Sequence, residues 1–224
     1  MLKLKAFAAV IFDLDGLVLD SESTYQVAWQ QAAAAMRCGL TDSFCRSLSG
    51  LSGPDVLQKL QQACGPDFDM ATFNRLSGGF WRDFVNTHGI ALKYGFSELL
   101  AYVVEQQLPY CLATNSSRVN ALECLALAGI DGVFSVIVTR DDVQYGKPAP
   151  DIFHQAAQVM QVPIRQCLVL EDSPVGVLAA RRAEATVLMV SSSDGSEHDA
   201  DIPGVPRVAD LSVALALLQG NALV

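Results

Sequence analysis

The sequence predicts an α/β protein, a Rossmann-like three-layer sandwich built on a parallel sheet, with a small α-helical cap domain. Short apolar runs without polar alternation recur along the chain, and such runs are typical of strands buried on both faces. From about residue 95 these runs alternate with segments of helical length, which favours βαβ units with right-handed crossovers. Between the first apolar run and residue 95 the alternation stops and helical patterns fill the interval.

Each element of the sheet domain can be assigned in chain order. The first strand is expected at residues 8–12, where the apolar run AAVIF has no polar break. The later strands are runs of the same kind, and the helices between them are longer segments with apolar residues on one face. These strands are predicted at 110–114, 133–138, 167–171 and 186–190, and the helices at 97–107, 118–129, 149–161, 174–183 and 210–220. A polar, turn-rich loop is expected at 191–206.

A block of helices is expected after the first strand. Its helices are predicted at residues 21–38, 52–64 and 69–89, with Ser52 capping the second and with Gly78 and Gly79 weakening or dividing the third. Because this block interrupts the alternation of strands and helices, we expect a core domain of residues 1–17 and 93–224 and an inserted cap of residues 18–92. Lids of this kind commonly exclude water and select substrate.

The composition indicates a soluble globular protein without a polyanionic partner. Lys and Arg together number 15 against 24 Asp and Glu, which gives a net charge of -9. The sequence has no cluster of Lys and Arg that could follow a nucleic-acid backbone or an anionic membrane. We therefore expect neither nucleic acid nor a membrane as a partner, and nothing in the sequence requires more than a monomer.

The cysteines and the N-terminal segment indicate a cytoplasmic protein. The 6 cysteines form no CxxC pair and most lie in apolar segments, so we expect reduced thiols rather than disulfides or structural zinc. Lys3 and Lys5 precede a short apolar run, as in a secretion signal, but Asp13 and Asp15 break that run before any cleavage pattern. A cytoplasmic location is therefore expected.

Four polar signatures lie beyond the carboxyl ends of the predicted strands. In open parallel sheets the ligand crevice lies outside those ends, so signatures that are far apart in sequence are expected to meet at one site. The four signatures are Asp13-Leu14-Asp15-Gly16, Thr114-Asn115-Ser116, Lys147 in GKPAPDIF, and Glu171-Asp172.

The first signature has the composition of a metal-assisted phosphoryl-transfer site. Asp13 and Asp15 are two positions apart, so in extended chain both carboxylates face one ligand, and Gly16 lets the chain turn close to that ligand. The two acids repel each other, and magnesium, which prefers hard oxygen ligands, would relieve the repulsion. An ionised carboxylate can attack phosphorus while its neighbour protonates the leaving oxygen. The alternative is a solvated Asp-Gly turn, against which the other three signatures argue.

The second and third signatures supply groups that suit a phosphate. Thr114, Asn115 and Ser116 end a predicted strand and precede a helix, so hydroxyls, an amide and helical N–H groups can form an anion cradle. The alternative for this segment is simple helix capping. Lys147 is flanked by Gly146 and by prolines that fix its loop, and its ammonium suits a phosphate or an aspartate nucleophile. The alternative is a solvated surface lysine.

The fourth signature favours metal binding. Glu171 and Asp172 could cap the helix that follows them, but with Asp13 and Asp15 they would place four acids around one point, which is hard to sustain without a cation. In the cap, Arg82 is a candidate for gripping a second anionic group of the substrate. Glu22 either reaches the substrate or favours the start of a helix.

With these residues the chain resembles the haloacid dehalogenase superfamily, in the phosphatase and β-phosphoglucomutase-like branch whose helical cap follows the first strand. All four motifs of the superfamily occur in order, and the resemblance covers essentially the whole chain. The segments GKPAPDIF and EDSPVGVLAA are the most specific, whereas DLDG or TNSS alone would be weak.

The resemblance implies a role for each core residue. Asp13 would be the nucleophile that becomes an aspartyl-phosphate, and Asp15 the general acid and base. Thr114 and Asn115 would bind phosphate, and Lys147 would steady nucleophile and phosphate together. The implied magnesium ligands are Asp13, the backbone carbonyl of Asp15, and Asp172, with Glu171 helping directly or through water.

The chain departs from the pattern of the superfamily at several positions. Leu17 stands where Thr or Val is usual and Glu184 where a glycine is usual, and neither change touches a reacting group. The related β-phosphoglucomutases carry a histidine where Tyr25 lies and an arginine in the segment that here contains Gly53. The resemblance therefore implies simple hydrolysis rather than sugar phosphomutase activity.

We expect a magnesium-dependent phosphatase that hydrolyses a small phosphorylated metabolite, with sugar phosphates among the candidates, through an aspartyl-phosphate intermediate. A phosphomutase and a dehalogenase are alternatives with the same fold. Dehalogenation needs no magnesium, so the acidic pair Glu171-Asp172 argues against it. The alternative from another class is a protein that binds a phosphorylated ligand without turnover, against which the intact set of catalytic positions argues.

Overall fold

The computed structural model describes residues 6–48, 53–191 and 202–220. The chain divides into two compact units, one of residues 1–20 and 91–224 and the other of residues 21–90. Ser52 and most of the expected loop at 191–206 lie outside the described residues. In the described part of the chain, no helix combines the length and apolarity needed to cross a membrane. The cytoplasmic location stays a prediction.

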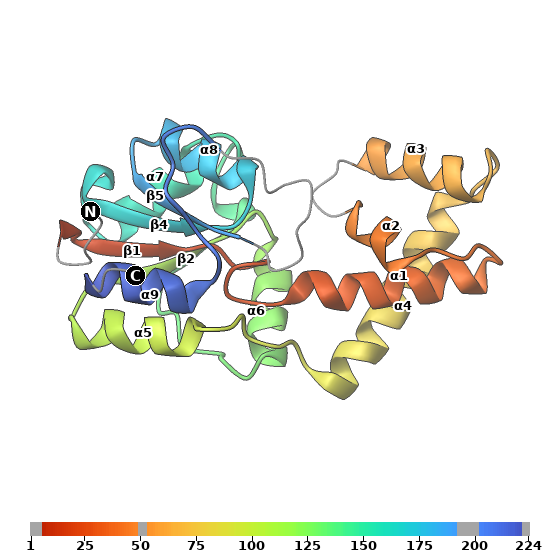
Figure 1. Cartoon of the computed structure of the whole chain (residues 1–224), viewed down its shortest axis with the longest axis horizontal. Coiled ribbons are helices and arrows are strands. Elements are labelled where there is room, and N and C mark those ends of the chain that lie inside the picture. Colours follow the sequence, from red (N-terminus) through yellow and green to blue (C-terminus); the bar gives the residue numbers. More distant parts are fainter. Residues whose placement is uncertain (1–5, 49–52, 192–201, 221–224) are drawn as a thin grey trace. The chain divides into compact units, whose positions relative to one another are not determined.

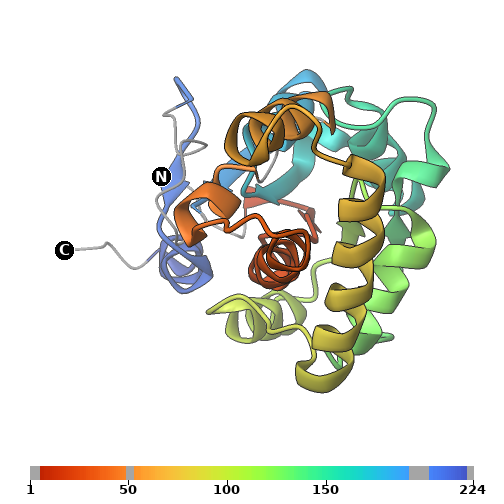
Figure 2. The same cartoon turned by 90° about the vertical axis from the view of Figure 1, so that its right-hand side faces the viewer.

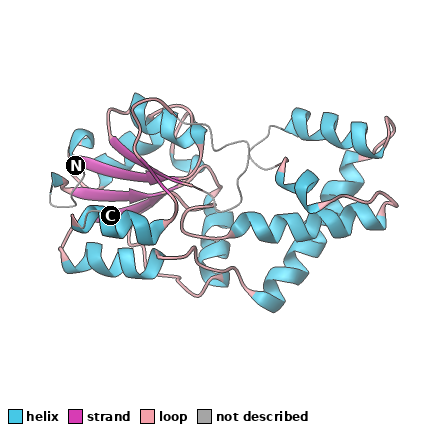
Figure 3. Ribbon diagram, in the orientation of Figure 1, coloured by secondary structure: helices cyan, strands magenta, loops and turns pink. Residues whose placement is uncertain are grey.

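The first unit is built on a six-stranded parallel sheet with strand order β3-β2-β1-β4-β5-β6 (Figures 1 and 3). The central strand is β1, which pairs with β2 on one side and β4 on the other, so that Ile11 lies opposite Cys111 and Val169. The strands are β1 Ala9–Phe12, β2 Tyr110–Ala113, β3 Ile137–Val138, β4 Cys167–Glu171, β5 Thr186–Val190 and β6 Arg207–Val208. The predicted parallel sheet is confirmed.

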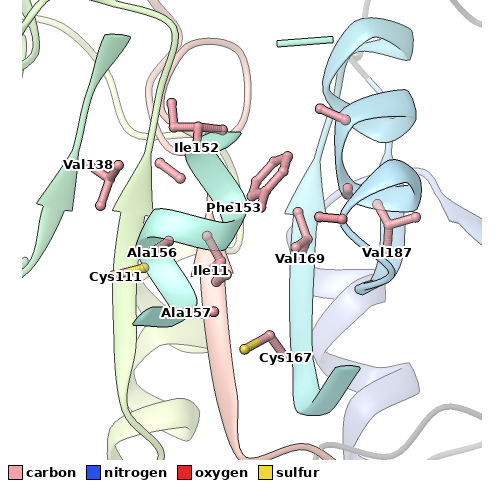
Figure 4. Close-up of a cluster of buried hydrophobic side chains, with 14 of the residues drawn as sticks. Ile11, Cys111, Val138, Ile152, Phe153, Ala156, Ala157, Cys167, Val169 and Val187 are labelled. Atoms are coloured by element: carbon pink, nitrogen blue, oxygen red, sulfur yellow. The ribbon is translucent and has the colours of Figure 1, made fainter. Parts of the chain in front are cut away.

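Helices cover both faces of this sheet, which gives the three layers that the sequence predicts (Figure 1). On one face Ile11 and Val169 pack against Phe153 and Ala156 of α7 in a buried apolar cluster (Figure 4). Because both faces are covered, the strands need apolar residues at every position rather than at alternate ones. The helices of this unit are α5 Phe96–Glu105, α6 Arg118–Leu127, α7 Asp151–Val159, α8 Pro174–Arg182 and α9 Leu211–Gln219.

The other face of the sheet fixes the end of β1. The Phe12 ring packs edge-on against Phe96 of α5 and against Phe134, with ring centroids 5.9 Å apart in both pairs. Phe12 is fully buried, and burial of a side chain of this size contributes about 1.5–3 kcal/mol. The residue that follows Phe12 is therefore held by a rigid strand rather than by a loop.

The second unit is helical. It contains α1 Ser21–Ala35, α2 Asp42–Arg46, α3 Gly53–Cys64 and α4 Met70–His88. Within it, α1 packs against α4 (Figure 2). The indole Nε1 of Trp81 donates a hydrogen bond to Thr24 Oγ1 at 2.9 Å, and the ring of Tyr25 stacks on the Trp81 ring with centroids 5.4 Å apart.

Several elements differ from their predictions. Helix α4 runs unbroken through Gly78 and Gly79, because Phe73, Trp81 and Val85 form one buried stripe whose burial outweighs the low helix propensity of glycine. The strand predicted at 133–138 is only Ile137–Val138. The short elements α2 and β6 were not predicted, because elements of this length carry too little periodicity to be recognised.

The expectation that all cysteines are reduced is wrong, because Cys38 and Cys64 form a disulfide, with their Cα atoms 5.6 Å apart. Cys38 follows α1, and Cys64 is the last residue of α3. The pair is 26 residues apart, so only the packing of the helices brings the two thiols together. The expectation holds for the other cysteines, Cys45, Cys111, Cys124 and Cys167, which are buried thiols.

Titration of thiols in the unfolded protein tests the disulfide. In denaturant without reductant we expect four thiols to react with Ellman's reagent, those of Cys45, Cys111, Cys124 and Cys167, because Cys38 and Cys64 are paired. After reduction, all 6 cysteines should react. The double variant Cys38→Ser, Cys64→Ser is the control, and four thiols should react in it both before and after reduction. Reaction of every cysteine in the unreduced wild type would contradict the assignment.

Candidate active site

The site lies at the carboxyl ends of β1 and β4, which are neighbours in the sheet. Asp13 follows β1, and its backbone N–H donates to the carbonyl of Leu170 in β4 at 3.1 Å. Glu171 ends β4, and Asp172 follows it. One carboxylate oxygen from each of Asp13, Glu171 and Asp172 lies within 4.8 Å of the others. Parallel pairing of the strands thus brings acids together that are far apart in sequence.

Gly16 allows this close approach. It has a φ of +84°, and its N–H donates to the carbonyl of Leu19 at 2.9 Å, which closes the turn. A Cβ at this position would lie 2.0 Å from Asp172 Oδ2. Only glycine tolerates both the left-handed backbone and the contact, so Gly16 gives the carboxylate of Asp172 its place beside the turn.

Lys147 is the centre of the buried charges, and only 9% of the residue is exposed. Its Nζ contacts the carboxylate of Asp13, donates to Glu171 Oε1 at 2.6 Å and donates to the carbonyl oxygen of Ala113 at 3.0 Å. Burial alone would lower the pKa of Lys147, but the carboxylates of Asp13 and Glu171 raise it. The ammonium group therefore keeps its charge inside the protein.

Asp13 is held in an environment that disfavours its ionised form. Burial raises its pKa to about 8, because desolvation and the nearby carboxylates of Glu171 and Asp15 outweigh the opposing effect of Lys147. With all groups ionised, the three clustered carboxylates and the single Lys147 ammonium carry a net charge of -2. A divalent cation among these oxygens would balance that charge and favour the ionised carboxylate. The donor set thus fits a hard divalent cation.

Glu171 is fully buried, and both of its carboxylate oxygens have partners. Oε1 accepts from Lys147, whereas Oε2 accepts from the backbone N–H and from the hydroxyl of Ser173, both at 2.9 Å. The Ser173 hydroxyl also accepts from the N–H of Gly176 at 3.0 Å and so caps α8. The sequence alone did not identify Ser173 as part of the site, although its place before Pro174 marks it as a helix cap.

The segment after β2 contacts the other signatures. Thr114 is buried, and its Oγ1 accepts from the backbone N–H of Ser116 at 3.0 Å. The Ser116 hydroxyl donates to Asp15 Oδ2 at 2.7 Å. The side-chain amide of Asn115 pairs with the backbone of Lys147. The structure therefore brings the Thr114-Asn115-Ser116 segment next to the residues with which it was predicted to share a site.

The two predicted site residues of the cap lie in the helical unit. Glu22 is in the first turn of α1, and Arg82 is an exposed residue of α4. Because the structure describes each unit by itself, the roles of Glu22 and Arg82 stay predictions, as do the catalytic and phosphate-binding roles of the core residues.

Substitution of Gly176 tests the packing around Glu171. In Gly176→Ala the added Cβ would lie 1.7 Å from Glu171 Oε1, so the carboxylate must leave its contacts with Lys147 and Ser173. We expect a loss of about 1–3 kcal/mol in the free energy of unfolding, measured in urea.

The control is Gly78→Ala, which makes the same change inside a helix. Apart from the adjoining residues and the backbone of the helix itself, no atom of the described residues lies within 4 Å of the added Cβ. The substitution should stabilise the protein by up to about 1 kcal/mol, because alanine has the higher helix propensity. Equal effects of the two substitutions would refute the packing argument.

Comparison with known proteins identifies relatives along most of the chain. Residues 10–190 match the family described as haloacid dehalogenase-like hydrolase. The chain is 30% identical over 180 residues to the fructose-1-phosphate phosphatase YqaB of Escherichia coli (strain K12). The aligned region covers 79% of this chain and 93% of that protein. It is also 30% identical over 176 residues to the phosphorylated carbohydrates phosphatase of Thermotoga maritima, with 78% and 81% covered.

A solved structure shares the fold over nearly the full length. The HAD family hydrolase from Deinococcus radiodurans R1, determined with bound phosphate and sodium, matches with a TM-score of 0.81 at 26% identity and 96% coverage of both chains. The family match spans most of the chain and includes all but the first residue of β1, the whole of β4 and the clustered acids. On this evidence the chain belongs to the haloacid dehalogenase-like hydrolases.

Proposed function

We propose that this protein hydrolyses the phosphoric monoester of a small phosphorylated metabolite, of the sugar phosphate class, with magnesium and through an aspartyl-phosphate. The observation that carries the proposal is the buried Lys147 ammonium in contact with Asp13, inside a cluster of three carboxylates. The names of the two relatives, a fructose-1-phosphate phosphatase and a phosphorylated carbohydrates phosphatase, support the substrate class.

In the first half of the proposed reaction Asp13 attacks phosphorus through a carboxylate oxygen. An O–P bond forms to Asp13 while the bond from phosphorus to the ester oxygen breaks. Asp15, held by the Ser116 hydroxyl, donates a proton to the departing oxygen and releases the alcohol. Lys147 lies beside the attacking carboxylate, where its charge offsets the charge of the incoming phosphoryl group.

In the second half water attacks the phosphorus of the aspartyl-phosphate. Asp15, now ionised, takes a proton from the water as the O–P bond to Asp13 breaks, and inorganic phosphate leaves. Asp13 returns to its carboxylate form and Asp15 to its acid form, so the cycle closes without any other reactant. Hydrolysis of this kind needs an acid and base that acts twice, which is the role proposed for Asp15.

Magnesium would be held by Asp13 and Asp172, with the backbone carbonyl of Asp15 and with Glu171 directly or through water. When bound, the ion supplies positive charge that offsets the clustered carboxylates and the phosphate. Glu171 has partners on both oxygens, which favours contact through water for this residue. Asp172 is partly exposed and beside Gly16, which suits a direct ligand.

Replacement of the nucleophile tests the proposed reaction. Asp13→Asn keeps the shape of the side chain but removes the attacking carboxylate, so hydrolysis of p-nitrophenyl phosphate and of sugar phosphates should fall on the order of a thousandfold or more. Release of inorganic phosphate is the measurement. The control is Asp131→Asn, the same change at an exposed residue of the core unit, and it should retain wild-type rates.

The outcomes separate the possible functions. Unchanged turnover by Asp13→Asn contradicts the proposal. A wild type that binds phosphate esters without hydrolysing them indicates a non-catalytic protein. Isomerised hexose phosphate in place of inorganic phosphate would indicate a mutase.

Removal of the metal gives a second test. EDTA should lower the hydrolysis rate to below about a tenth, and added magnesium should restore it, because the ion offsets clustered negative charge. Magnesium at about ten times its Kd should also stabilise the folded wild type by about 1.4 kcal/mol in a thermal melt, and Asp172→Asn should lack this effect. Full activity after EDTA treatment, with no magnesium effect on the melt, would contradict the metal assignment.

A further inference from the structure

We infer that Asn115 is a positioning residue whose side chain holds the backbone of Lys147. Its Oδ1 accepts a hydrogen bond from the Lys147 N–H at 2.8 Å, and its Nδ2 donates to the Lys147 carbonyl oxygen at 3.1 Å. One amide side chain thus pairs with both backbone groups of a residue that is 32 positions away. The inference rests on the proposed function, because the place of Lys147 matters most where that site takes a phosphoryl group.

Lys147 needs such a partner because it lies outside the regular elements. It falls between β3 and α7, and in the described part of the chain no strand or helix supplies hydrogen bonds to its N–H and carbonyl. An unpaired backbone group that is removed from water costs free energy, and an amide side chain can donate and accept in the same way as a neighbouring strand. The side-chain amide of Asn115 therefore supplies Lys147 with the two backbone hydrogen bonds that a neighbouring strand would otherwise supply.

The loop approaches Asn115 closely at the preceding residue as well. A Cβ on Gly146 would lie 2.5 Å from Asn115 Oδ1 and 2.7 Å from Arg140 Cδ, so the segment fits only with glycine there. Arg140 is held in turn, because its guanidinium donates to the carbonyl of Val143 at 2.9 Å. The loop backbone is thus fixed at Lys147 by hydrogen bonds with Asn115, and at Gly146 by close packing.

Fixing the backbone determines where the ammonium group lies. A lysine side chain has about 2 kcal/mol of rotamer entropy, so a mobile backbone would add further freedom to an already flexible group. In this structure Nζ is within reach of Asp13, Glu171 and the carbonyl of Ala113 together. Asn115 follows the carboxyl end of β2, and β2 is the neighbour of β1 in the sheet. The hydrogen bonds from Asn115 therefore fix the position of Lys147 relative to β1, the strand that precedes Asp13.

This role differs from the one that the resemblance implied for Asn115, which was to bind phosphate. The oxygen and nitrogen of its side-chain amide already have partners in the Lys147 backbone. Phosphate can only accept from this amide, so a direct contact would have to use the second N–H of Nδ2, because the first is donated to the Lys147 carbonyl. The two roles predict different responses when Lys147 itself is changed, and a double-mutant cycle separates them.

The cycle compares the wild type, Asn115→Ala, Lys147→Met and the double variant. The probe is inorganic phosphate, titrated by calorimetry in magnesium buffer. With Lys147 present, Asn115→Ala should weaken phosphate binding about tenfold, because two hydrogen bonds to the lysine backbone are lost. In the Lys147→Met background, Asn115→Ala should change nothing further. The matched control is Asn120→Ala, the same change in the first turn of α6, and it should leave phosphate affinity unchanged.

Several results would overturn the inference. Equal weakening in both backgrounds would make Asn115 a direct phosphate ligand, and no weakening in either would make it dispensable. A wild type that binds phosphate but fails to hydrolyse esters leaves the positioning role standing and removes the proposed function. A wild type that binds no phosphate overturns both.

A second measurement avoids dependence on the Lys147→Met protein. In the wild type Lys147 is 9% exposed and its Nζ is in contact with Asp13 and Glu171, so limiting acetic anhydride should label it slowly, as read by mass spectrometry. In Asn115→Ala the released lysine should be labelled several times faster, whereas Asn120→Ala should label as the wild type does. Asn115 is itself an exposed residue, so its substitution leaves no core cavity. Unchanged labelling of Lys147 in Asn115→Ala would also overturn the inference.

Discussion

The buried ion pair between Lys147 and the carboxylates of Asp13 and Glu171 is the constraint on which the site depends. Charges removed from water are tolerated only when they are paired and hydrogen-bonded. Here the ammonium has three acceptors, and Glu171 has partners on both oxygens. Strands β1 and β4 supply the rigidity, because both are buried along their whole length and lie side by side.

The small residues of the site follow from that constraint. Gly16 leaves space for Asp172, Gly176 for Glu171, and Gly146 for the amide of Asn115. In each case the missing Cβ would collide with a polar side chain of the site rather than with the apolar core. These glycines are therefore needed for the arrangement of the polar side chains of the site, although they contact no phosphoryl group in the proposed reaction.

The sequence could predict the place of the acids, because apolar runs predict the strands and the carboxyl ends of parallel strands lie at the same edge of the sheet. Asp13, Glu171 and Asp172 needed no more than that rule. The pairing of Asn115 with the Lys147 backbone could not be predicted, because it depends on where an irregular loop returns across 32 positions. The Cys38–Cys64 disulfide was missed for the same reason, since helix packing decides which thiols meet.

The balance of charge in the site links the proposed metal to the proposed substrate. Lys147 supplies one positive charge against three clustered carboxylates, so a phosphate dianion that approached this cluster alone would be repelled. Burial, together with the nearby carboxylates of Glu171 and Asp15, raises the pKa of Asp13 to about 8, which weakens Asp13 as a nucleophile at neutral pH. A bound divalent cation would reverse both effects at once. Metal binding, ionisation of Asp13 and phosphate binding are therefore expected to reinforce one another rather than to occur independently.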